Sequence, residues 1–122
     1  MVSDRAPATA LSFAIGTVVT TPDAATFVDG VACRVPDPEA VRTMVAGAHG
    51  IRAVSDDDCA EAMRVLLRTT HLLAEPAGAI ALAGLIADRD AVAGARVAVV
   101  LSGGNCDADL LAEVLAGRTP AP

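Results

Sequence analysis

A hydroxyl group and two glycines directly follow a strongly apolar run near the end of the sequence. Residues 96–101, RVAVVL, are typical of a buried strand, and Ser102-Gly103-Gly104 comes next. In open α/β sheets, ligands bind beyond the carboxyl ends of the strands. The glycine amides could bind an anion at the start of the following helix, or Ser102 could donate to a heterocycle while the glycine backbone passes beside it. A plain tight turn between strand and helix is the third possibility.

Two acidic residues bear on the choice between these ligands. Asp107 and Asp109 fall in the first turn of a helix expected over residues 107–116. Carboxylates in this position would repel a phosphate group that approached the same amides. The anion is therefore disfavoured, but the Ser-Gly-Gly motif alone does not decide between a heterocycle and a turn.

The sequence contains no lysine, and its nine basic residues are all arginines. Arginine stays protonated and cannot act as an amine nucleophile. Chemistry that needs a Schiff-base amine from these residues is therefore excluded. No catalytic residue is assigned within them.

Composition argues against several other functions. A net charge of −6 and only two aromatic residues, Phe13 and Phe27, disfavour nucleic acid and anionic membranes as partners. The three cysteines are far apart and form no CxxC pair, so neither a metal site nor a disulfide framework is indicated. Asp56, Asp57 and Asp58 are interpreted as an acidic first helical turn rather than as metal ligands. Without a signal-peptide pattern or a membrane-length apolar run, the expected location is the cytoplasm.

The elements that must position Ser102 are predicted from periodicity and from turn signals. Ser55, with Asp58 three residues later, indicates a capping box at a helix start. Alternating helices and strands predict an α/β fold, with a partial parallel sheet flanked by helices and with a long exposed edge. Helices are expected over 7–15, 38–48, 55–70, from 76 and over 107–116, and short strands over 17–21, 51–54 and 96–101.

The helix that begins at Pro76 is apolar nearly all round, so we expect it to be buried on several sides. Gly78 and Gly84 each cost this helix about 1 kcal/mol relative to alanine. Close approach of another backbone, or of a flat ligand, would offset that cost. Glu75 lies directly before this helix.

Four stretches together are more specific than any single motif. VSDRAPATALSFAIG, TFVDGVACRVPDPEAV, VSDDDCAEAMRVLLRTTHLLAEPAGAIALAGLIA and RVAVVLSGGNCDADLL occur in this order. They resemble the C-terminal part of the catalytic domain of the serine/threonine dehydratases, also called threonine ammonia-lyases. These are pyridoxal-phosphate enzymes with the tryptophan synthase β-like fold (fold type II). The resemblance covers nearly all 122 residues.

The resemblance implies a cofactor-binding role for four residues. Ser102 matches the residue that hydrogen-bonds the pyridine nitrogen, with Gly103 beside it, and Gly30 matches a residue whose backbone lies against the ring. Glu75 matches an acidic residue near the nitrogen side. A hydroxyl suits a neutral pyridine nitrogen, and a glycine has no Cβ to displace the ring. No metal ligands are expected, because Ser3 and Asp4 do not restore the family's metal pattern.

The departures from the family are larger than the matches. The family's Schiff-base lysine, phosphate loop and substrate-carboxylate loop belong to a part of the domain that these residues do not include. We therefore expect a truncated or split segment that binds pyridoxal phosphate weakly or not at all alone and is inactive alone. A lysine-bearing N-terminal half or a full-length homologue would complete it, in an oligomer acting on a small hydroxy amino acid. The sequence does not decide whether the substrate is serine or threonine.

A second interpretation belongs to a different class of function. The chain could be a non-catalytic interaction protein that docks on a full-length homologue, or on another partner, through its exposed sheet edge. The expected domain covers residues 1–116, with a flexible tail over 117–122.

Overall fold

A short parallel pair of strands lies at the centre of the molecule. In the computed structural model, which describes residues 1–122, β1 (Val2–Ser3) pairs with β2 (Ala53–Val54). Val2 is opposite Ala53, and Ser3 is opposite Val54. The predicted α/β class with a partial parallel sheet is confirmed, although the sheet has only these two strands.

The predicted helices all form, because each has local start or stop signals. The Ser55 hydroxyl accepts from the Asp58 amide, and the Asp58 carboxylate accepts from Ser55, which confirms the capping box. Asp37 caps the helix that starts at Pro38, and Gly16 ends the first helix in the left-handed conformation. The elements are α1 (Ala8–Ile15), the 3-10 helix η1 (Asp29–Val31), α2 (Pro38–Gly47), α3 (Asp56–Thr70), α4 (Pro76–Ala87) and α5 (Ala108–Leu115).

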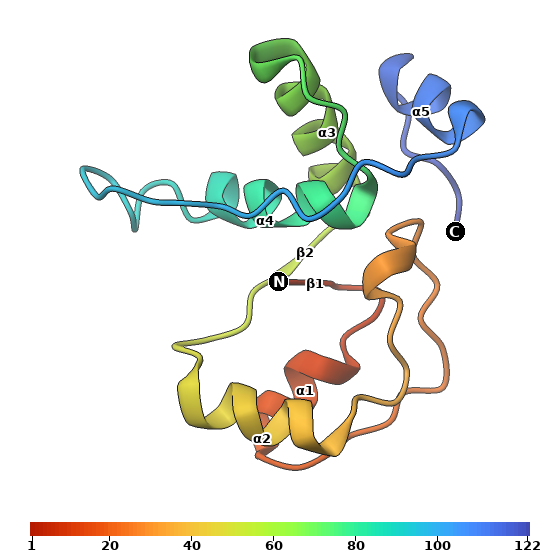
Figure 1. The fold of residues 1–122 in the computed structure, drawn as a ribbon. Helices are drawn as coiled ribbons and strands as arrows, with labels where there is room; N and C mark the ends of the chain where they lie inside the picture. The colour runs from red at the N-terminus through yellow and green to blue at the C-terminus, as the bar shows by residue number, and fades with distance from the viewer.

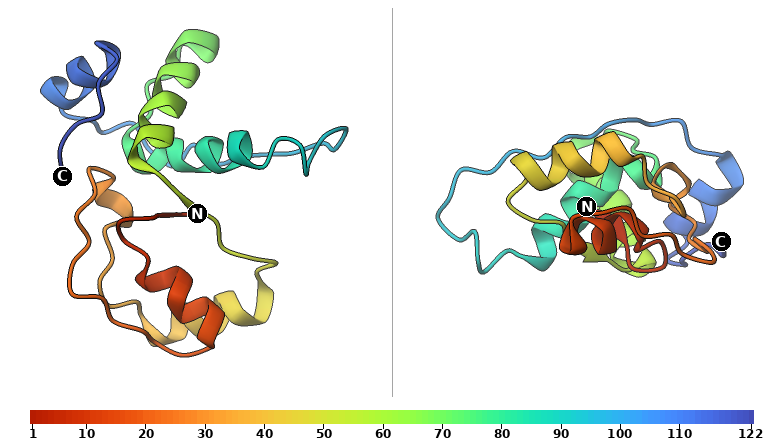
Figure 2. Two further views of the ribbon diagram at one scale, coloured as in Figure 1. Left: turned by 180° about the vertical axis from the view of Figure 1, so that it is seen from behind. Right: turned by 90° about the horizontal axis from the view of Figure 1, so that it is seen from below.

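The helices form two groups on either side of the strand pair. Figure 1 shows α1 and α2 together on one side, and α3, α4 and α5 on the other; the view from behind in Figure 2 agrees. The core lies in the second group, where α3 packs on α4. Alanine supplies much of it, as the composition predicts: the fully buried core residues include Ala60, Ala62 and Ala79.

Asp56, in the first turn of α3, connects α3 to β1 and to the segment before η1 through hydrogen bonds. Its side chain is buried and accepts hydrogen bonds from the Ser3 hydroxyl at 3.0 Å, the Thr26 hydroxyl, and the Phe27 amide at 3.3 Å. The sequence predicts an acidic first turn here, and the structure adds that one of the three aspartates is an internal hydrogen-bond acceptor.

Two predicted strands are wrong. Residues 17–21 and 96–101 belong to no sheet. No backbone amide or carbonyl of residues 96–102 forms a hydrogen bond, and residues 96–100 are exposed. An apolar run becomes a strand only where a neighbouring strand offers a ladder of donors and acceptors, and residues 1–122 supply none at this position.

The C-terminal residues contact the start of α3. The Thr119 hydroxyl donates to the Asp57 carboxylate, and Pro120 is buried. The division into a domain over 1–116 and a flexible tail stays a prediction. None of the helices combines the length and the apolarity that crossing a lipid bilayer requires.

Candidate functional site

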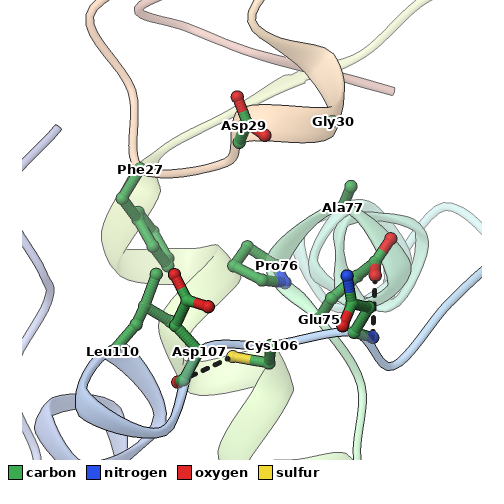
Figure 3. Close-up of a pocket in the computed structure, with 10 residues that line it drawn as sticks. Phe27, Asp29, Gly30, Glu75, Pro76, Ala77, Cys106, Asp107 and Leu110 are labelled. Carbon is green, nitrogen blue, oxygen red and sulfur yellow. Dashed lines mark hydrogen bonds between the residues drawn. The ribbon is translucent and has the colours of Figure 1, made fainter.

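A cavity of about 380 Å³ lies where η1, the start of α4 and the segment before α5 meet. Figure 3 shows these elements facing one another across it. Residues far apart in the sequence therefore share one site. The lining residues are Phe27, Asp29, Gly30, Glu75, Pro76, Ala77, Asn105, Cys106, Asp107 and Leu110.

Gly30 lines this cavity and packs closely on α4. A Cβ built on Gly30 would lie 2.6 Å from the Cβ of Ala77. Real Cβ atoms do not approach so closely, so a larger residue would push η1 away from the first turn of α4. The backbone at Gly30 is thus held at the cavity wall by packing against Ala77.

Glu75 lines the cavity two residues before Ala77, and two hydrogen bonds with backbone groups fix it. Its amide donates to the Gly103 carbonyl at 3.1 Å, and its carboxylate accepts from the Asn105 amide at 2.9 Å. A Cβ on Gly103 would lie 2.6 Å from the Glu75 carboxylate, so a larger residue there would displace that side chain from its hydrogen bond with Asn105. Gly103 therefore packs against Glu75 but does not itself line the cavity.

Ser102 is exposed and does not line the cavity. The structure brings together Gly30 and Glu75, places Gly103 behind them, and leaves Ser102 at the edge of an unpaired segment. Their roles toward a cofactor stay predictions.

The sequence predicts a close approach of another backbone to α4 at Gly78 and Gly84. The structure shows such a backbone at Gly78 but not at Gly84. A Cβ on Gly78 would collide with the backbone carbonyl of Gly103, whereas a Cβ on Gly84 would meet only the side chain of Met1. Gly78 is therefore what lets residues 103–105 lie against α4 and hold Glu75.

This contrast gives a matched pair of variants within one helix. Alanine at either position gains about 1 kcal/mol of helix propensity. We expect Gly78→Ala nevertheless to lower the free energy of unfolding by about 1–2 kcal/mol, because the Gly103 backbone must shift. Gly84→Ala should be neutral or stabilising, since a flexible methionine side chain can move. Urea denaturation measures both, and equal effects would contradict the proposed packing.

The sequence analysis missed several residues that line the cavity. Asn105 acts through its backbone amide, so its side chain gives no signal. Its position directly after Ser102-Gly103-Gly104 is the only clue. Burial raises the pKa of the Cys106 thiol, with further contributions from the negative charges of Asp107 and Glu75.

The lining charges decide which ligand groups fit. Asp29, Glu75 and Asp107 bring three carboxylates to the cavity, and no arginine or histidine lines it. A phosphate group finds no counter-charge here, and an aldehyde finds no amine. The residues present do not fit the charged or reactive ends of pyridoxal phosphate, and the apolar Phe27, Ala77 and Leu110 are the part of the lining that a flat ring could contact. No group of three or more His, Cys, Asp or Glu side chains is arranged to hold a metal ion.

The family model described as "Pyridoxal-phosphate dependent enzyme" matches residues 2–103. The chain therefore belongs to this family, and the resemblance to serine/threonine dehydratases is confirmed.

Individual relatives agree with the family. L-threonine ammonia-lyase of Thermotoga maritima is 31% identical over 90 residues, which are 74% of this chain and 22% of that protein. The chain thus spans about a fifth of the length of this curated relative.

Solved structures show the tryptophan synthase β-like fold. A threonine deaminase from T.th. superposes with a TM-score of 0.79 at 28% identity, covering 86% of this chain and 38% of that one. The processed form of threonine deaminase isoform 2 from Solanum lycopersicum gives a TM-score of 0.87 at 24% identity, with coverages of 93% and 32%.

Proposed function

We propose that residues 1–122 supply the pyridine-ring side of a pyridoxal-phosphate site in a cytoplasmic threonine/serine dehydratase. The reaction would remove water from a small hydroxy amino acid and give an imine that hydrolyses to a 2-oxo acid and ammonia. The observation that carries this proposal is that Gly30 and the Asn105-bound Glu75 face one cavity in a chain of this family.

When bound, pyridoxal phosphate supplies an electron-withdrawing ring that stabilises negative charge at the substrate Cα. Residues 1–122 would orient that ring. Gly30 would present backbone to the face of the ring, and Ser102, which lies outside the cavity lining in residues 1–122, would donate to the ring nitrogen in the complete site.

The remaining parts of the site must come from polypeptide outside residues 1–122. One net hydrogen bond from Ser102 contributes about 1 kcal/mol, which cannot hold the cofactor alone. The amine that bonds the aldehyde, and the groups that bind the phosphate, are absent from the cavity lining. We therefore expect this chain to be inactive by itself.

The test combines this chain with a segment of Thermotoga maritima L-threonine ammonia-lyase that ends where the similarity begins. We expect ammonia release from threonine in the presence of pyridoxal phosphate only when both polypeptides are mixed. Ser102→Ala should lower this rate about fivefold, since the loss of a hydrogen bond of about 1 kcal/mol corresponds to about fivefold.

The matched control is Thr43→Ala, which removes an exposed hydroxyl from α2, far from the cavity lining. It should leave the rate unchanged. Equal rates for Ser102→Ala and Thr43→Ala would contradict the role given to Ser102.

A second candidate is a non-catalytic interaction protein. The exposed valines between residues 97 and 100 favour it, because an unpaired apolar segment suits docking. A stable complex with the Thermotoga segment that releases no ammonia and shows no cofactor band would support this alternative.

A further inference from the structure

We infer that Arg64 is a positioning residue that holds the C-terminal end of α5 against α3 and thereby sets the wall that α5 contributes to the cavity. This deepens the proposed function: an effect of Arg64 on the cofactor chemistry rests on that function, whereas its effect on the cavity wall does not. α5 packs on α3, and Figures 1 and 2 show the two helices as neighbours.

Arg64 joins these two helices by hydrogen bonds. Its Nη1 donates to the Val114 carbonyl in the last turn of α5 at 3.0 Å and to the Arg118 carbonyl after the helix at 3.4 Å. Its Nε donates to the Glu61 carboxylate, one turn earlier in α3, at 2.7 Å. Glu61 thus holds the planar guanidinium in the orientation in which Nη1 reaches α5. The positive charge of Arg64 also lies at the negative end of the α5 dipole.

Other polar contacts between α3 and the C-terminal part of the chain lie outside α5. No backbone hydrogen bond links residues 107–122 to α3. The Thr119 hydroxyl donates to the Asp57 carboxylate, but Thr119 comes after the end of α5. Within the helix, the fully buried Val114 makes apolar contact with the core. Arg64 is therefore the side chain of α3 that hydrogen-bonds α5 itself.

The opposite end of α5 forms part of the cavity wall. Leu110, one turn before Val114, and Asp107, directly before the helix, line the cavity beside Cys106 (Figure 3). Residues four apart lie on the same face of a helix. Because backbone hydrogen bonds keep the turns of this eight-residue helix together, a shift at Val114 would also move Leu110 and Asp107.

Cys106 reports on the position of this wall. Its thiol is partly buried and donates to the Asp107 carbonyl at 3.7 Å. Burial raises the pKa of the Cys106 thiol, and the charges of Asp107 and Glu75 raise it further. Outward movement of α5 would expose the thiol and take the Asp107 charge away from it. The thiol pKa would then fall, and the larger thiolate fraction would react faster with iodoacetamide.

The test measures the rate at which iodoacetamide labels each of the three thiols, followed by mass spectrometry of the peptides. We expect Arg64→Ala to speed the labelling of Cys106 about tenfold, because the loss of charge-assisted hydrogen bonds shifts an equilibrium by about this factor. The labelling of Cys33, which does not line the cavity, and of Cys59, which is buried in the core, should not change.

The matched control is Arg68→Ala, which removes an arginine from the next turn of the same helix. Arg68 also pairs with Glu61, at 3.7 Å, but its side chain is 65% exposed and forms no hydrogen bond with α5. This variant should be labelled like the unaltered chain. Arg64→Lys keeps the positive charge and a donor, so its Cys106 rate should fall between those of the unaltered chain and Arg64→Ala. It preserves the comparison where the alanine variant does not fold.

Two labelling results would overturn the inference. One is equal labelling of Cys106 in the Arg64 and Arg68 variants. The other is acceleration of Cys59 by the same factor as Cys106, which would mean that the whole core opens rather than that α5 moves.

Ammonia release in the mixture with the Thermotoga segment tests the proposed function separately. If the mixture with the unaltered chain releases none, the proposed function fails, while the labelling rates still decide the role of Arg64. If this mixture is active, Arg64→Ala should lower the rate and Arg68→Ala should not. Equal rates for the two variants would overturn the link between this cavity wall and the reaction.

Discussion

Replacing Asp56 with alanine is expected to lower the free energy of unfolding by about 3–5 kcal/mol. The buried carboxylate accepts from the Ser3 hydroxyl, the Thr26 hydroxyl and the Phe27 amide. Its removal leaves these donors without a partner in the interior. The effect is large because the three donors belong to β1 and to the segment before η1, so their loss disturbs the contacts of both with the start of α3.

The matched control is Asp57→Ala, in the same helical turn. Asp57 is exposed, so its loss should cost less than about 1 kcal/mol. Asp56→Asn keeps one acceptor oxygen and should fall between the two, which preserves the comparison where the alanine variant does not fold. Urea denaturation followed by far-UV circular dichroism measures all three. Similar effects at positions 56 and 57 would contradict the role given to Asp56.

Stability is expected to fall steeply between pH 9 and pH 12. Burial raises the pKa of the Cys59 thiol from 9.0 to about 12, with contributions from the charges of Asp56 and Asp58. The thiol also donates to the Pro76 carbonyl at 3.0 Å. In this pH range the unfolded chain has released the Cys59 proton and the folded chain retains it. The free energy of unfolding therefore drops by about 1.4 kcal/mol per pH unit, about 4 kcal/mol in all.

Because the chain contains no lysine and no tyrosine, the pH dependence of stability in this range reports mainly on the thiols. No ammonium or phenol side chain titrates between pH 9 and pH 12, so the thiols dominate the change. Cys59→Ala should remove most of the slope, at a cost of about 1 kcal/mol near neutral pH. Cys33→Ala, at a partly exposed position, should keep the slope. An unchanged slope in Cys59→Ala would contradict the assignment to this thiol.

The helices could be predicted from the sequence because their signals are local. Ser55 with Asp58, Asp37 before Pro38, and Gly16 after Ile15 each lie within a few residues of the helix end that they define. The state of residues 96–101 could not be predicted in this way, because a strand forms only where a partner strand lies elsewhere in the fold. Its apolar pattern is correct for a buried strand, but residues 1–122 contain nothing for it to pair with.

Part of the candidate site could also be predicted from the sequence, and part of it could not. Resemblance pointed to Gly30 and Glu75, and the structure places both at one cavity. The hydrogen bond from the Asn105 amide to Glu75 depends on how the chain folds back, and no residue type signals it. Ser102 remains outside the cavity because it continues the unpaired strand.

The account depends on the proposal that this chain supplies the ring side of a cofactor site, while its sequence contains no lysine side chain to bond the cofactor. Its most direct test is the visible absorbance spectrum of the chain after incubation with pyridoxal phosphate and exhaustive dialysis. We predict no retained cofactor band for the chain alone, and a retained band after mixing with the lysine-bearing Thermotoga segment that exceeds the band of that segment by itself. A retained band on the chain alone would contradict the claim.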